Sequence, residues 1–263
     1  MPVEECLRIR PDVEVANLSD VGCERTGNED YFLYFEPQDD GEFERRGRLI
    51  VVTDGMGGQS GGEVAGRLAA ETVRDTFMES DSADPREVLI AGFRAAQQAI
   101  LELAAETPLL RGMGATCCAA ILKRGRMQYA HVGDSRIYVI RNGDAQPLTE
   151  DHSLVARRVR DGILTPEEAE NHEDRHVLTA ALGMDSESLE GDFPVEPYPL
   201  EPGDIVLLST DGLHGIVSNP EIGRIAAANS PQEACRELVA LAKQRGGPDN
   251  ITVQLLAVRL VER

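Results

Sequence analysis

The sequence has no long apolar run. None of its hydrophobic stretches approaches the roughly 18 residues that a membrane-spanning helix needs, so no transmembrane segment is expected. The first ten residues, MPVEECLRIR, also lack the apolar centre of a secretory signal peptide. These two absences predict a cytoplasmic protein.

Basic residues are scarce. The 263 residues include 26 Lys and Arg against 46 Asp and Glu, which gives a net charge of −20. A protein that binds duplex nucleic acid needs a basic patch, and an anionic membrane attracts basic segments, so neither partner is expected. Because clustered carboxylates bind cations, part of the acidic excess points to a metal site instead.

The sequence also lacks the usual zinc and disulfide patterns. The cysteines are odd in number and contain no C-x-x-C pair, which favours reduced thiols in a cytoplasmic protein. Cys117 and Cys118 are neighbours in a predicted strand and are expected to point to opposite faces. No zinc cluster is expected, because the five histidines lack paired ligand spacing. Among them, His131 and His214 are expected to be structural, and His152 to cap or orient the helix that follows.

Apolar periodicity predicts antiparallel sheets covered by helices. Hydrophobic residues make up 41% of the chain, enough for a sizeable core. Long consecutive helices and strand meanders do not alternate as regular βαβ units, which argues against a doubly wound parallel sheet. The predicted strands are 13–18, 31–35, 49–52, 115–122, 128–132, 137–140, 205–209 and 251–258. The predicted helices are 62–78, 85–105, 220–228 and 231–244, with a mostly helical stretch at 151–170.

Turn signals fill the gaps between these segments. The polar residues 36–47 are expected to form a hairpin or surface loop, and Asn142-Gly143 indicates a hairpin turn. No internal repeat, low-complexity tract or long linker divides the chain. The prediction is therefore one domain over residues 1–263.

The stretch LIVVTDGMGG, residues 49–58, organises the rest of the chain. A buried strand runs into Asp54 and then into a glycine-rich turn over residues 55–62. Taken alone, this is equally well an Asp-Gly turn without chemistry. Similar aspartates recur at other predicted strand ends, namely Asp30, Asp134, Asp211 and Asp249.

If these strand ends meet, several carboxylates share one site. Two such charges about 4 Å apart repel by roughly 4 kcal/mol at an effective dielectric near 20. Protons or cations must then intervene, and divalent cations are the simplest answer. An all-oxygen ligand set suits Mg²⁺ or Mn²⁺ rather than Zn²⁺.

An ordered set of motifs covers nearly the whole chain. They are R-x-x-N-E-D at 25–30, V-x-D-G-M-G-G at 52–58, M-G-A-T at 113–116, H-V-G-D-S-R at 131–136, L-T-x-D-H-S at 148–153, S-T-D-G-L at 209–213 and P-D-N-I-T at 248–252. Together they resemble the motifs of metal-dependent protein serine/threonine phosphatases, the PPM or PP2C-type family, and its bacterial subtype in particular. One motif alone is weak, but the set in this order is highly specific.

That resemblance implies an α+β fold, a four-layer α-β-β-α sandwich with two central antiparallel sheets flanked by helices. It implies two core Mn²⁺ or Mg²⁺ ions, with Asp54 bridging both and the Gly55 carbonyl binding one. Asp211 and Asp249 would bind the other ion. Asp134 would join Asp211 in holding a weaker third ion.

The resemblance also assigns residues around the metals. Glu29 and Asp30 would hold metal-bound waters, and Arg25 would grip the substrate phosphate through its planar guanidinium. Arg25, Asp54, Asp211 and Asp249 are therefore the predicted catalytic residues. A flap beside the site would span about 161–182.

The implied reaction is hydrolysis of phosphoserine and phosphothreonine in proteins by direct attack of a water activated by two metals. Its partners would be phosphorylated proteins, a Ser/Thr kinase and its substrates, with the phosphatase acting as a monomer. Two positions depart from relatives. Met56 replaces a histidine that is proposed as general acid in eukaryotic members. His176 stands near the position at which some relatives carry a serine that touches the third metal.

Several alternatives stay open. Without the adjacent N-E-D, Arg25 would be a surface salt bridge, and Asp134 on its own is a turn aspartate. Aspartyl-nucleophile phosphatases need D-x-D, but Val52 stands two residues before Asp54. A phospho-binding pseudoenzyme of the same fold would be expected to have lost a metal ligand, and a partner-switching phosphatase would act on one phosphoserine regulator.

Overall fold

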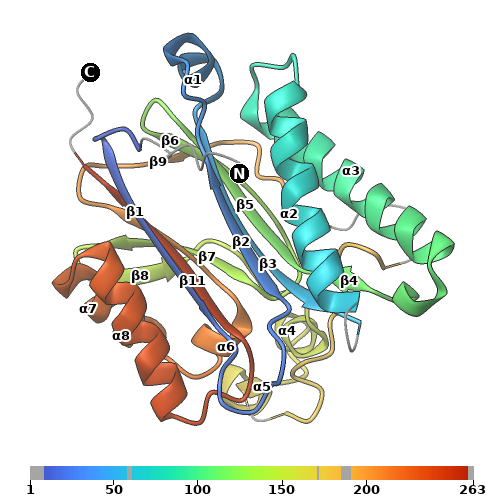
Figure 1. The fold of residues 1–263 in the computed structure, drawn as a ribbon. Coiled ribbons are helices and arrows are strands. Elements are labelled where there is room, and N and C mark those ends of the chain that lie inside the picture. The colour runs from blue at the N-terminus through green and yellow to red at the C-terminus, as the bar shows by residue number, and fades with distance from the viewer. Residues whose placement is uncertain (1–8, 58–60, 171, 185–190, 260–263) are drawn as a thin grey trace.

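In the computed structural model, which describes residues 9–57, 61–170, 172–184 and 191–259, two sheets lie face to face between outer layers of helices (Figure 1). The first sheet has the strand order β1 (Val13–Asp20), β11 (Ile251–Val258), β10 (Ile205–Ser209), β7 (Arg136–Arg141), β8 (Asp144–Pro147). The second has the order β2 (Asp30–Phe35), β3 (Arg48–Met56), β5 (Cys117–Lys123), β6 (Arg126–Val132), β9 (Tyr198–Pro199), with β4 (Gly114–Ala115) beside β3. All of these strand pairs are antiparallel, as predicted.

Helices cover the outer face of each sheet. The second sheet is covered by α2 (Gly61–Glu79) and α3 (Pro85–Glu106), and the first by α7 (Asn219–Ala228) and α8 (Pro231–Gln244) (Figure 1). The short helices are α4 (Leu154–Arg160), α5 (Pro166–Glu170), α6 (Asp211–His214) and the 3-10 turn η1 (Pro108–Leu110). The layers therefore run helix, sheet, sheet, helix, which confirms the predicted α-β-β-α sandwich.

Strand alternation divides the core into three layers. On β3, Leu49 and Val51 face the α2–α3 side, whereas Ile50 and Val52 face the other sheet. Cys117 and Cys118 separate in the same way, which confirms their predicted opposite faces. Burying one such aliphatic side chain stabilises the fold by about 1.5–3 kcal/mol.

Among the described residues, α3 is the one helix long and apolar enough, by length and composition, to cross a membrane. Its apolar face is occupied within the protein, because Leu89, Phe93 and Ile100 are buried in the core beside α2. A core helix of a globular protein passes the same test of length and composition.

Residues 36–47 contain a helix, so the predicted hairpin or surface loop is wrong. Helix α1 (Asp40–Arg46) begins after Asp39, whose side chain accepts a hydrogen bond from the Glu42 backbone N–H at 2.9 Å. One turn on, Glu42 pairs with Arg46 at 2.7 Å. These local capping contacts form the helix despite the polar composition.

Strand β3 extends past its predicted end at Val52. Asp54 and Gly55 lie inside it, because Asp30 of β2 pairs with Asp54 and Ala115 of β4 pairs with Gly55. The predicted glycine-rich turn begins beyond Met56, and its residues 58–60 lie outside the described part of the chain.

The other predicted elements differ in smaller ways. The predicted strand 115–122 divides at Thr116 into β4 and β5, and the stretch 151–170 forms the two short helices α4 and α5. The Asn142-Gly143 hairpin joins β7 to β8, as predicted. Strand β9 and helix α6 carried no sequence signal of their own.

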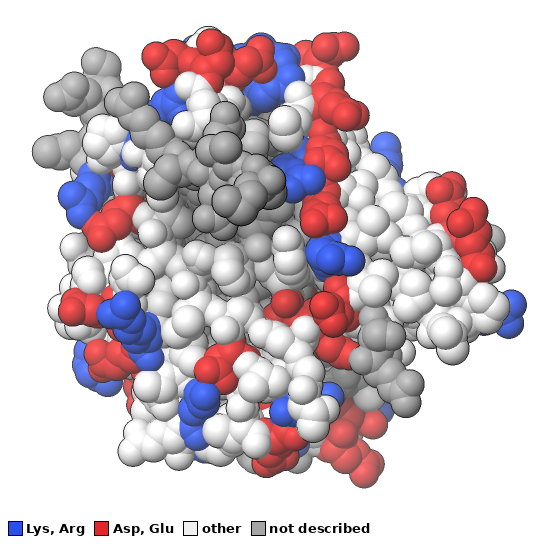
Figure 2. All heavy atoms as spheres, viewed as in Figure 1, with Lys and Arg blue, Asp and Glu red and all other residues white. Residues whose placement is uncertain are grey.

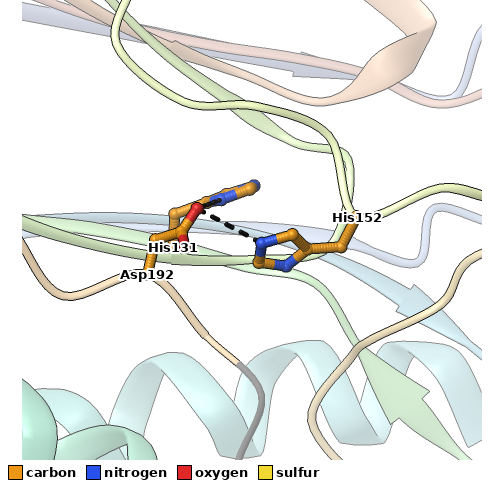
Figure 3. Close-up of side chains that lie close together, drawn as sticks. All are labelled: His131, His152 and Asp192. Carbon is orange, nitrogen blue, oxygen red and sulfur yellow. Dashed lines mark hydrogen bonds and ion pairs between the residues drawn. The ribbon is translucent and has the colours of Figure 1, made fainter. Parts of the chain in front are cut away.

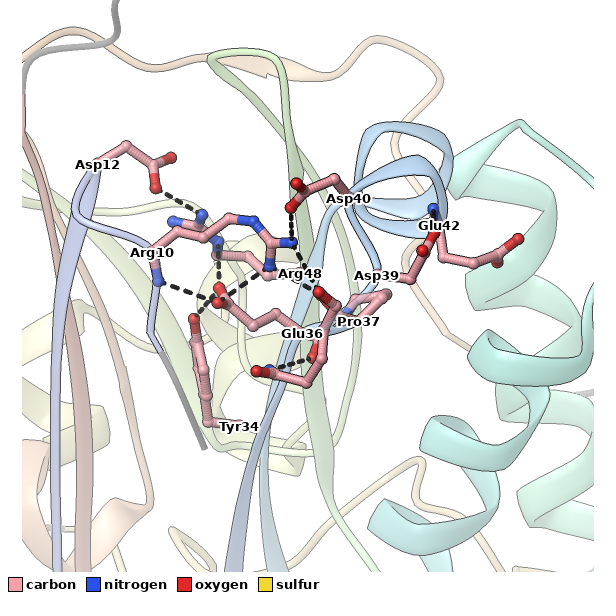
Figure 4. Close-up of polar contacts among 10 residues, drawn as sticks. Arg10, Asp12, Tyr34, Glu36, Pro37, Asp39, Asp40, Glu42 and Arg48 are labelled. Carbon is pink, nitrogen blue, oxygen red and sulfur yellow. Dashed lines mark hydrogen bonds and ion pairs between the residues drawn. The ribbon is translucent and has the colours of Figure 1, made fainter. Parts of the chain in front are cut away.

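A buried network of ion pairs and hydrogen bonds lies at one end of the two sheets (Figure 4). Arg48 opens β3 and Glu36 follows β2, and both side chains are almost fully buried, with Arg48 Nε 3.3 Å from Glu36 Oε2. The Tyr34 hydroxyl donates to Glu36 at 2.6 Å, and Arg48 donates to Asp12 at 2.7 Å. The Arg10 guanidinium lies over the Phe43 ring of α1, 3.9 Å from its centroid. The predicted site residues lie at the opposite end of these strands.

Candidate metal centre

Both sheets deliver aspartates to that opposite end. In the second sheet, Asp30 opens β2 and lies across from Asp54 in the antiparallel register. In the first sheet, Asp211 follows β10 as the first residue of α6, and Asp249 precedes β11. Asp134 lies in the turn from β6 to β7, which connects the two sheets. Antiparallel pairing therefore brings together the five aspartates that the sequence singled out.

Asp54 is held in place through its backbone. Its N–H donates to Thr116 Oγ1 at 3.0 Å and its carbonyl accepts from the Thr116 N–H at 2.8 Å. Thr116 Oγ1 also lies 2.7 Å from Ser135 Oγ, which ties β3 to the turn that carries Asp134. Burial, followed by the charges of neighbouring aspartates, raises the pKa of Asp54 well above its usual value.

Gly55 permits a close approach of β3 to α2. A Cβ at this position would lie 2.0 Å from the Gly62 carbonyl oxygen and 2.8 Å from that of Glu29. The Gly55 N–H donates to the Glu29 carbonyl at 3.1 Å. The Glu29 carboxylate lies against the first turn of α2, where a Cβ on Gly62 would be 2.6 Å from Glu29 Oε2.

Asp30 is buried and bonded on one side only. Thr210 donates to its Oδ2 at 2.9 Å, while Oδ1 has no partner among the residues that the structure describes. Burial raises the pKa of Asp30 to about 7, against the lowering effect of the Thr252 and Thr210 hydroxyls and with the charge of Asp211 adding to the rise. In the absence of a cation this carboxyl therefore holds a proton near neutrality.

Asp134 shares this environment. Burial, then the charge of Asp211, raises the pKa of Asp134 to about 8. Gly133, just before it, has φ +102, and a Cβ there would lie 2.5 Å from the Thr116 methyl group, so only glycine fits this turn.

Asp211 faces the flap. Its Oδ2 lies 3.6 Å from His176 Nδ1, and its buried Oδ1 has no partner within the described residues. Burial acts to raise the pKa of Asp211, but His176 and His214 together outweigh it and lower the pKa. His176, one of the two positions that depart from relatives, therefore lies beside Asp211, a predicted metal ligand.

Arg25 and Asp249 form the rim of the cluster. Arg25 Nη2 donates to Asp249 Oδ2 at 2.8 Å, and 54% of the Arg25 side chain is exposed. The alternative reading of Arg25, a salt bridge, therefore occurs in this structure, and the exposed part of the guanidinium leaves the predicted phosphate grip open. Next to Asp249, Asn250 accepts from the Glu29 N–H at 2.8 Å and donates to the Gly27 carbonyl at 2.9 Å, which fixes the loop that carries Arg25.

The residues at this centre fit divalent cations. Asp30 and Asp211 each direct an unpartnered carboxylate oxygen into the buried cluster, within the described part of the chain. The raised pKa values of Asp30 and Asp134 show that the site resists negative charge when no cation is bound. Carboxylate and carbonyl oxygens are the ligands that Mg²⁺ and Mn²⁺ prefer.

Sequence reasoning overlooked the polar residues that hold the ligands. Thr116, Ser135, Thr210, Thr252 and Asn250 all belong to the quoted motifs, but no role was predicted for them. The Thr252 N–H donates to Thr210 Oγ1 at 3.0 Å, and Thr210 donates to Asp30. Residues of two motifs therefore support the Asp30 carboxyl. The signal that could have found these residues is a hydroxyl or amide next to each predicted ligand.

The expected role of His152 in capping is also wrong. Ser153 caps α4, because its Oγ accepts from the Ala156 N–H at 3.2 Å. His152 instead contacts the turn that precedes Asp134: its Nδ1 accepts from the Gly133 N–H at 3.2 Å.

An oxygen-rich centre that fits divalent cations, at one end of a two-sheet sandwich, defines a metal-dependent enzyme of the α-β-β-α class. A family model, described as protein phosphatase 2C, matches residues 28–245. The chain belongs to the protein phosphatase 2C family.

Individual relatives agree. The chain is 34% identical over 250 residues to the protein phosphatase PhpP of Streptococcus pneumoniae, covering 94% of this chain and 98% of that one. The solved serine/threonine phosphatase of S. agalactiae is 32% identical, with a TM-score of 0.85 over 94% of this chain and all of that one. The catalytic domain of PstP, solved in complex with two manganese ions, is 31% identical, with a TM-score of 0.79 over 94% of this chain and 99% of that one.

The expected family and activity are thereby confirmed. The chain is a protein-serine/threonine phosphatase of bacterial PP2C type, and its metal dependence follows from the family.

Proposed function

We propose that this chain hydrolyses phosphoserine and phosphothreonine by direct attack of water at a centre built on Asp54, Gly55, Asp211 and Asp249. The observation that carries the proposal is the convergence of buried carboxylates from both sheets, with raised pKa values and unpartnered oxygens. Asp54 would bridge two ions, Gly55 would offer its carbonyl to one, and Asp211 and Asp249 would hold the other.

When bound, the divalent cations acidify water and neutralise the phosphoryl oxygens. The chain's own residues do the positioning. Glu29 and Asp30 would hold waters beside the ions, and the Thr210 hydroxyl, which donates to Asp30, would keep that carboxyl in place. Thr116 holds the backbone of Asp54 in register at the end of β3.

Arg25 would bind the substrate phosphate. In the protein without substrate its guanidinium pairs with Asp249, and more than half of the side chain is exposed. A phosphate carries more negative charge than a carboxylate, and any two of its free oxygens can accept from the guanidinium fork, so Arg25 can exchange partners as the substrate enters.

Protonation of the leaving group falls to another part of the site, because Met56 cannot donate a proton. Asp134, whose pKa burial raises to about 8, and Asp211 would hold a third, weaker cation that serves this step. Magnesium can replace manganese in this proposal.

The whole chain, residues 1–263, would act as one catalytic domain with a flap at about 161–182. The described part of that flap includes α5 and His176. We place the enzyme in the cytoplasm as a monomer in signal transduction, opposing a Ser/Thr kinase and acting on that kinase and its substrates. Asp54, Asp211 and Asp249 are all present, so a phospho-binding pseudoenzyme is not favoured.

Hydrolysis of phosphothreonine peptides with and without Mn²⁺ tests the proposal. We expect activity with Mn²⁺ or Mg²⁺, none in excess chelator, and poor activity with Zn²⁺. Asp211→Asn is the matched control, since it keeps the shape of a ligand but removes its charge, and it is expected to stay folded and inactive. Full activity in chelator would rule out the metal mechanism.

A further inference from the structure

Three side chains outside the carboxylate cluster meet behind the turn that carries Asp134: His131, His152 and Asp192 (Figure 3). Asp192 Oδ2 lies 3.7 Å from His131 Nδ1 and 3.2 Å from His152 Nε2. One ligand atom from each residue lies within 4.8 Å of the other two. The histidines are far apart in the sequence, so their spacing does not predict this cluster.

The backbone builds the cluster firmly. His131 and Asp192 exchange two backbone hydrogen bonds, of 3.1 and 2.8 Å, which hold the loop before β9 against β6. The His152 N–H donates to the Gly133 carbonyl at 2.8 Å, and the rings of His131 and His152 are 4.7 Å apart.

His131 is the anomaly in this cluster. Its side chain is 0% exposed, and neither ring nitrogen has a hydrogen-bond partner among the residues that the structure describes. The 3.7 Å separation from Asp192 is too long for a hydrogen bond. Burial lowers the pKa of His131, so the ring is neutral, which is the form that binds metal ions. A buried imidazole with two unused nitrogens lacks a ligand.

We propose that His131, His152 and Asp192 form a binding site for a zinc-like transition-metal ion, distinct from the carboxylate centre. Tetrahedral zinc with imidazole and carboxylate ligands places their atoms roughly 3.4 Å apart, which the separations of 3.2 and 3.7 Å bracket. Imidazole ligands favour zinc over Mg²⁺ or Mn²⁺. Asp192 is 52% exposed, so an ion can reach this ligand from solvent.

Metal binding at this site disturbs the turn that precedes Asp134. Because the Gly133 N–H donates to His152 Nδ1, the ring proton of neutral His152 is on Nε2 and faces Asp192. A neutral imidazole that binds a metal through Nε2 must carry its proton on Nδ1 instead. Two donors, Nδ1–H and the Gly133 N–H, would then face each other, so the metal breaks this hydrogen bond.

Zinc at this site is therefore an inhibitor. Loss of the Gly133 bond displaces the turn and moves Asp134 away from Asp211. The effect extends to the flap, because the His152 carbonyl accepts from the Thr179 N–H at 2.8 Å. The binding site stands independently of the proposed function, whereas the inhibition rests on the role proposed there for Asp134.

The full chain, saturated with Mn²⁺, is titrated with Zn²⁺, and bound zinc and retained manganese are counted after free metal is removed. His152→Asn is the sharpest variant, because its Oδ1 stands near the former Nδ1 and still accepts from Gly133, while the Nε2 ligand is gone. Asp192→Asn removes the exposed ligand, and His172→Asn is the control for a histidine outside the cluster. A second titration with Co²⁺ reports nitrogen coordination through its visible absorption.

We expect one zinc per chain in the wild type and in His172→Asn, with manganese retained and phosphothreonine hydrolysis reduced. Zinc binding is expected to weaken more than about tenfold in His152→Asn and Asp192→Asn, which then resist inhibition. Zinc binding unchanged in both variants, or matched by released manganese, would overturn the site. Zinc binding lost in both variants without any inhibition in the wild type would overturn the coupling to Asp134, whose own role Asp134→Ala tests separately.

Discussion

Arg25, the proposed phosphate ligand, already pairs with one anion. It contacts Asp249 at 2.8 Å, while 54% of its side chain is exposed. Arg25→Ala is expected to raise KM for phosphothreonine peptides about tenfold, with a smaller fall in kcat, because the contact is made already in the ground state. Steady-state kinetics in saturating Mn²⁺ measure both constants.

Arg25→Lys is the matched control for this prediction. It keeps the charge but loses the planar fork, so KM is expected to fall between those of the wild type and Arg25→Ala. A large loss in kcat with KM unchanged would instead assign Arg25 to the transition state alone.

Asp134 is distant in the sequence from Asp54, the proposed bridging ligand, and its proposed metal-binding partner is Asp211. If it serves leaving-group protonation, the need for it scales with the basicity of the leaving oxygen. Asp134→Ala is expected to lose about a hundredfold in activity on phosphothreonine peptides but less than about tenfold on p-nitrophenyl phosphate, because nitrophenolate barely needs a proton. Both rates are measured on protein shown by calorimetry to bind two ions. Equal fractional losses on the two substrates would remove Asp134 from this step.

At the scale of elements, the close contact between β3 and α2 positions the strand end that carries Asp54 and Gly55. A Cβ on Gly55 would lie 2.0 Å from the Gly62 carbonyl oxygen, so Gly55→Ala must push the strand and the helix apart. We expect a loss of about 2–3 kcal/mol in the free energy of unfolding, together with loss of turnover. Urea unfolding and peptide hydrolysis measure the two effects.

Gly27→Ala is the control for stability. A Cβ on Gly27 meets no atom within 4 Å, and its backbone is outside the left-handed region, so the free energy of unfolding is expected to change by less than about 0.5 kcal/mol. Similar losses in the two variants would show that the effect does not come from the contact between Gly55 and α2, because the smaller chain entropy of alanine acts to stabilise the fold.

The long elements were predictable because their patterns are local. The apolar face of α3 and the unbroken apolar run of β3 are typical of a core helix and a buried strand, and the motifs identified the family. The split at Thr116 was not predictable, because it depends on Asp54, a partner distant in the sequence. The helix α1 had a local signal in Asp39 and Glu42 that the polar composition concealed.

The candidate site, too, has one part that the sequence predicts and another that it does not. Each aspartate is next to a strand end or a glycine, which a sequence shows. The bond from Thr210 to Asp30 and the meeting of His131 with His152 depend on how two sheets face each other. Sequence patterns therefore predicted which carboxylates meet, and only the structure revealed the side chains that hold them.

At the scale of the whole molecule, the acidic excess is spread over the surface. Figure 2 shows Asp and Glu side chains gathered over α1, where Asp39, Asp40, Glu42 and Glu44 are exposed, far from the site. The metal centre therefore accounts for only part of the net charge of −20.

The metal-free protein is expected to lose stability as pH rises. Burial raises the pKa of Asp30 to about 7 and of Asp134 to about 8, from 3.8 in the unfolded chain. Below these values the folded state keeps protons that the unfolded state has released. The free energy of unfolding therefore falls as pH rises through 7 and 8, by up to about 1.4 kcal/mol per pH unit for each proton. Urea unfolding in chelator from pH 6.5 to 8.5 measures this slope.

Asp54→Asn tests the origin of that slope. It removes one charge from the repulsive cluster, so the variant is expected to stay folded, to be inactive, and to show a shallower decline with pH. Excess Mn²⁺ is expected to reverse the sign in the wild type, because cations compete with these protons. A slope that Asp54→Asn leaves unchanged would place its cause elsewhere.

The strand order has a consequence for synthesis. Strand β11 is the last strand of the described part of the chain, yet it lies between β1 and β10, and Asp249 lies two residues before it. A nascent chain on the ribosome therefore leaves a strand-wide gap in the first sheet until residue 258 has emerged. Phosphatase activity is therefore not expected before that moment, and an unfinished chain cannot act on phosphorylated proteins near the ribosome.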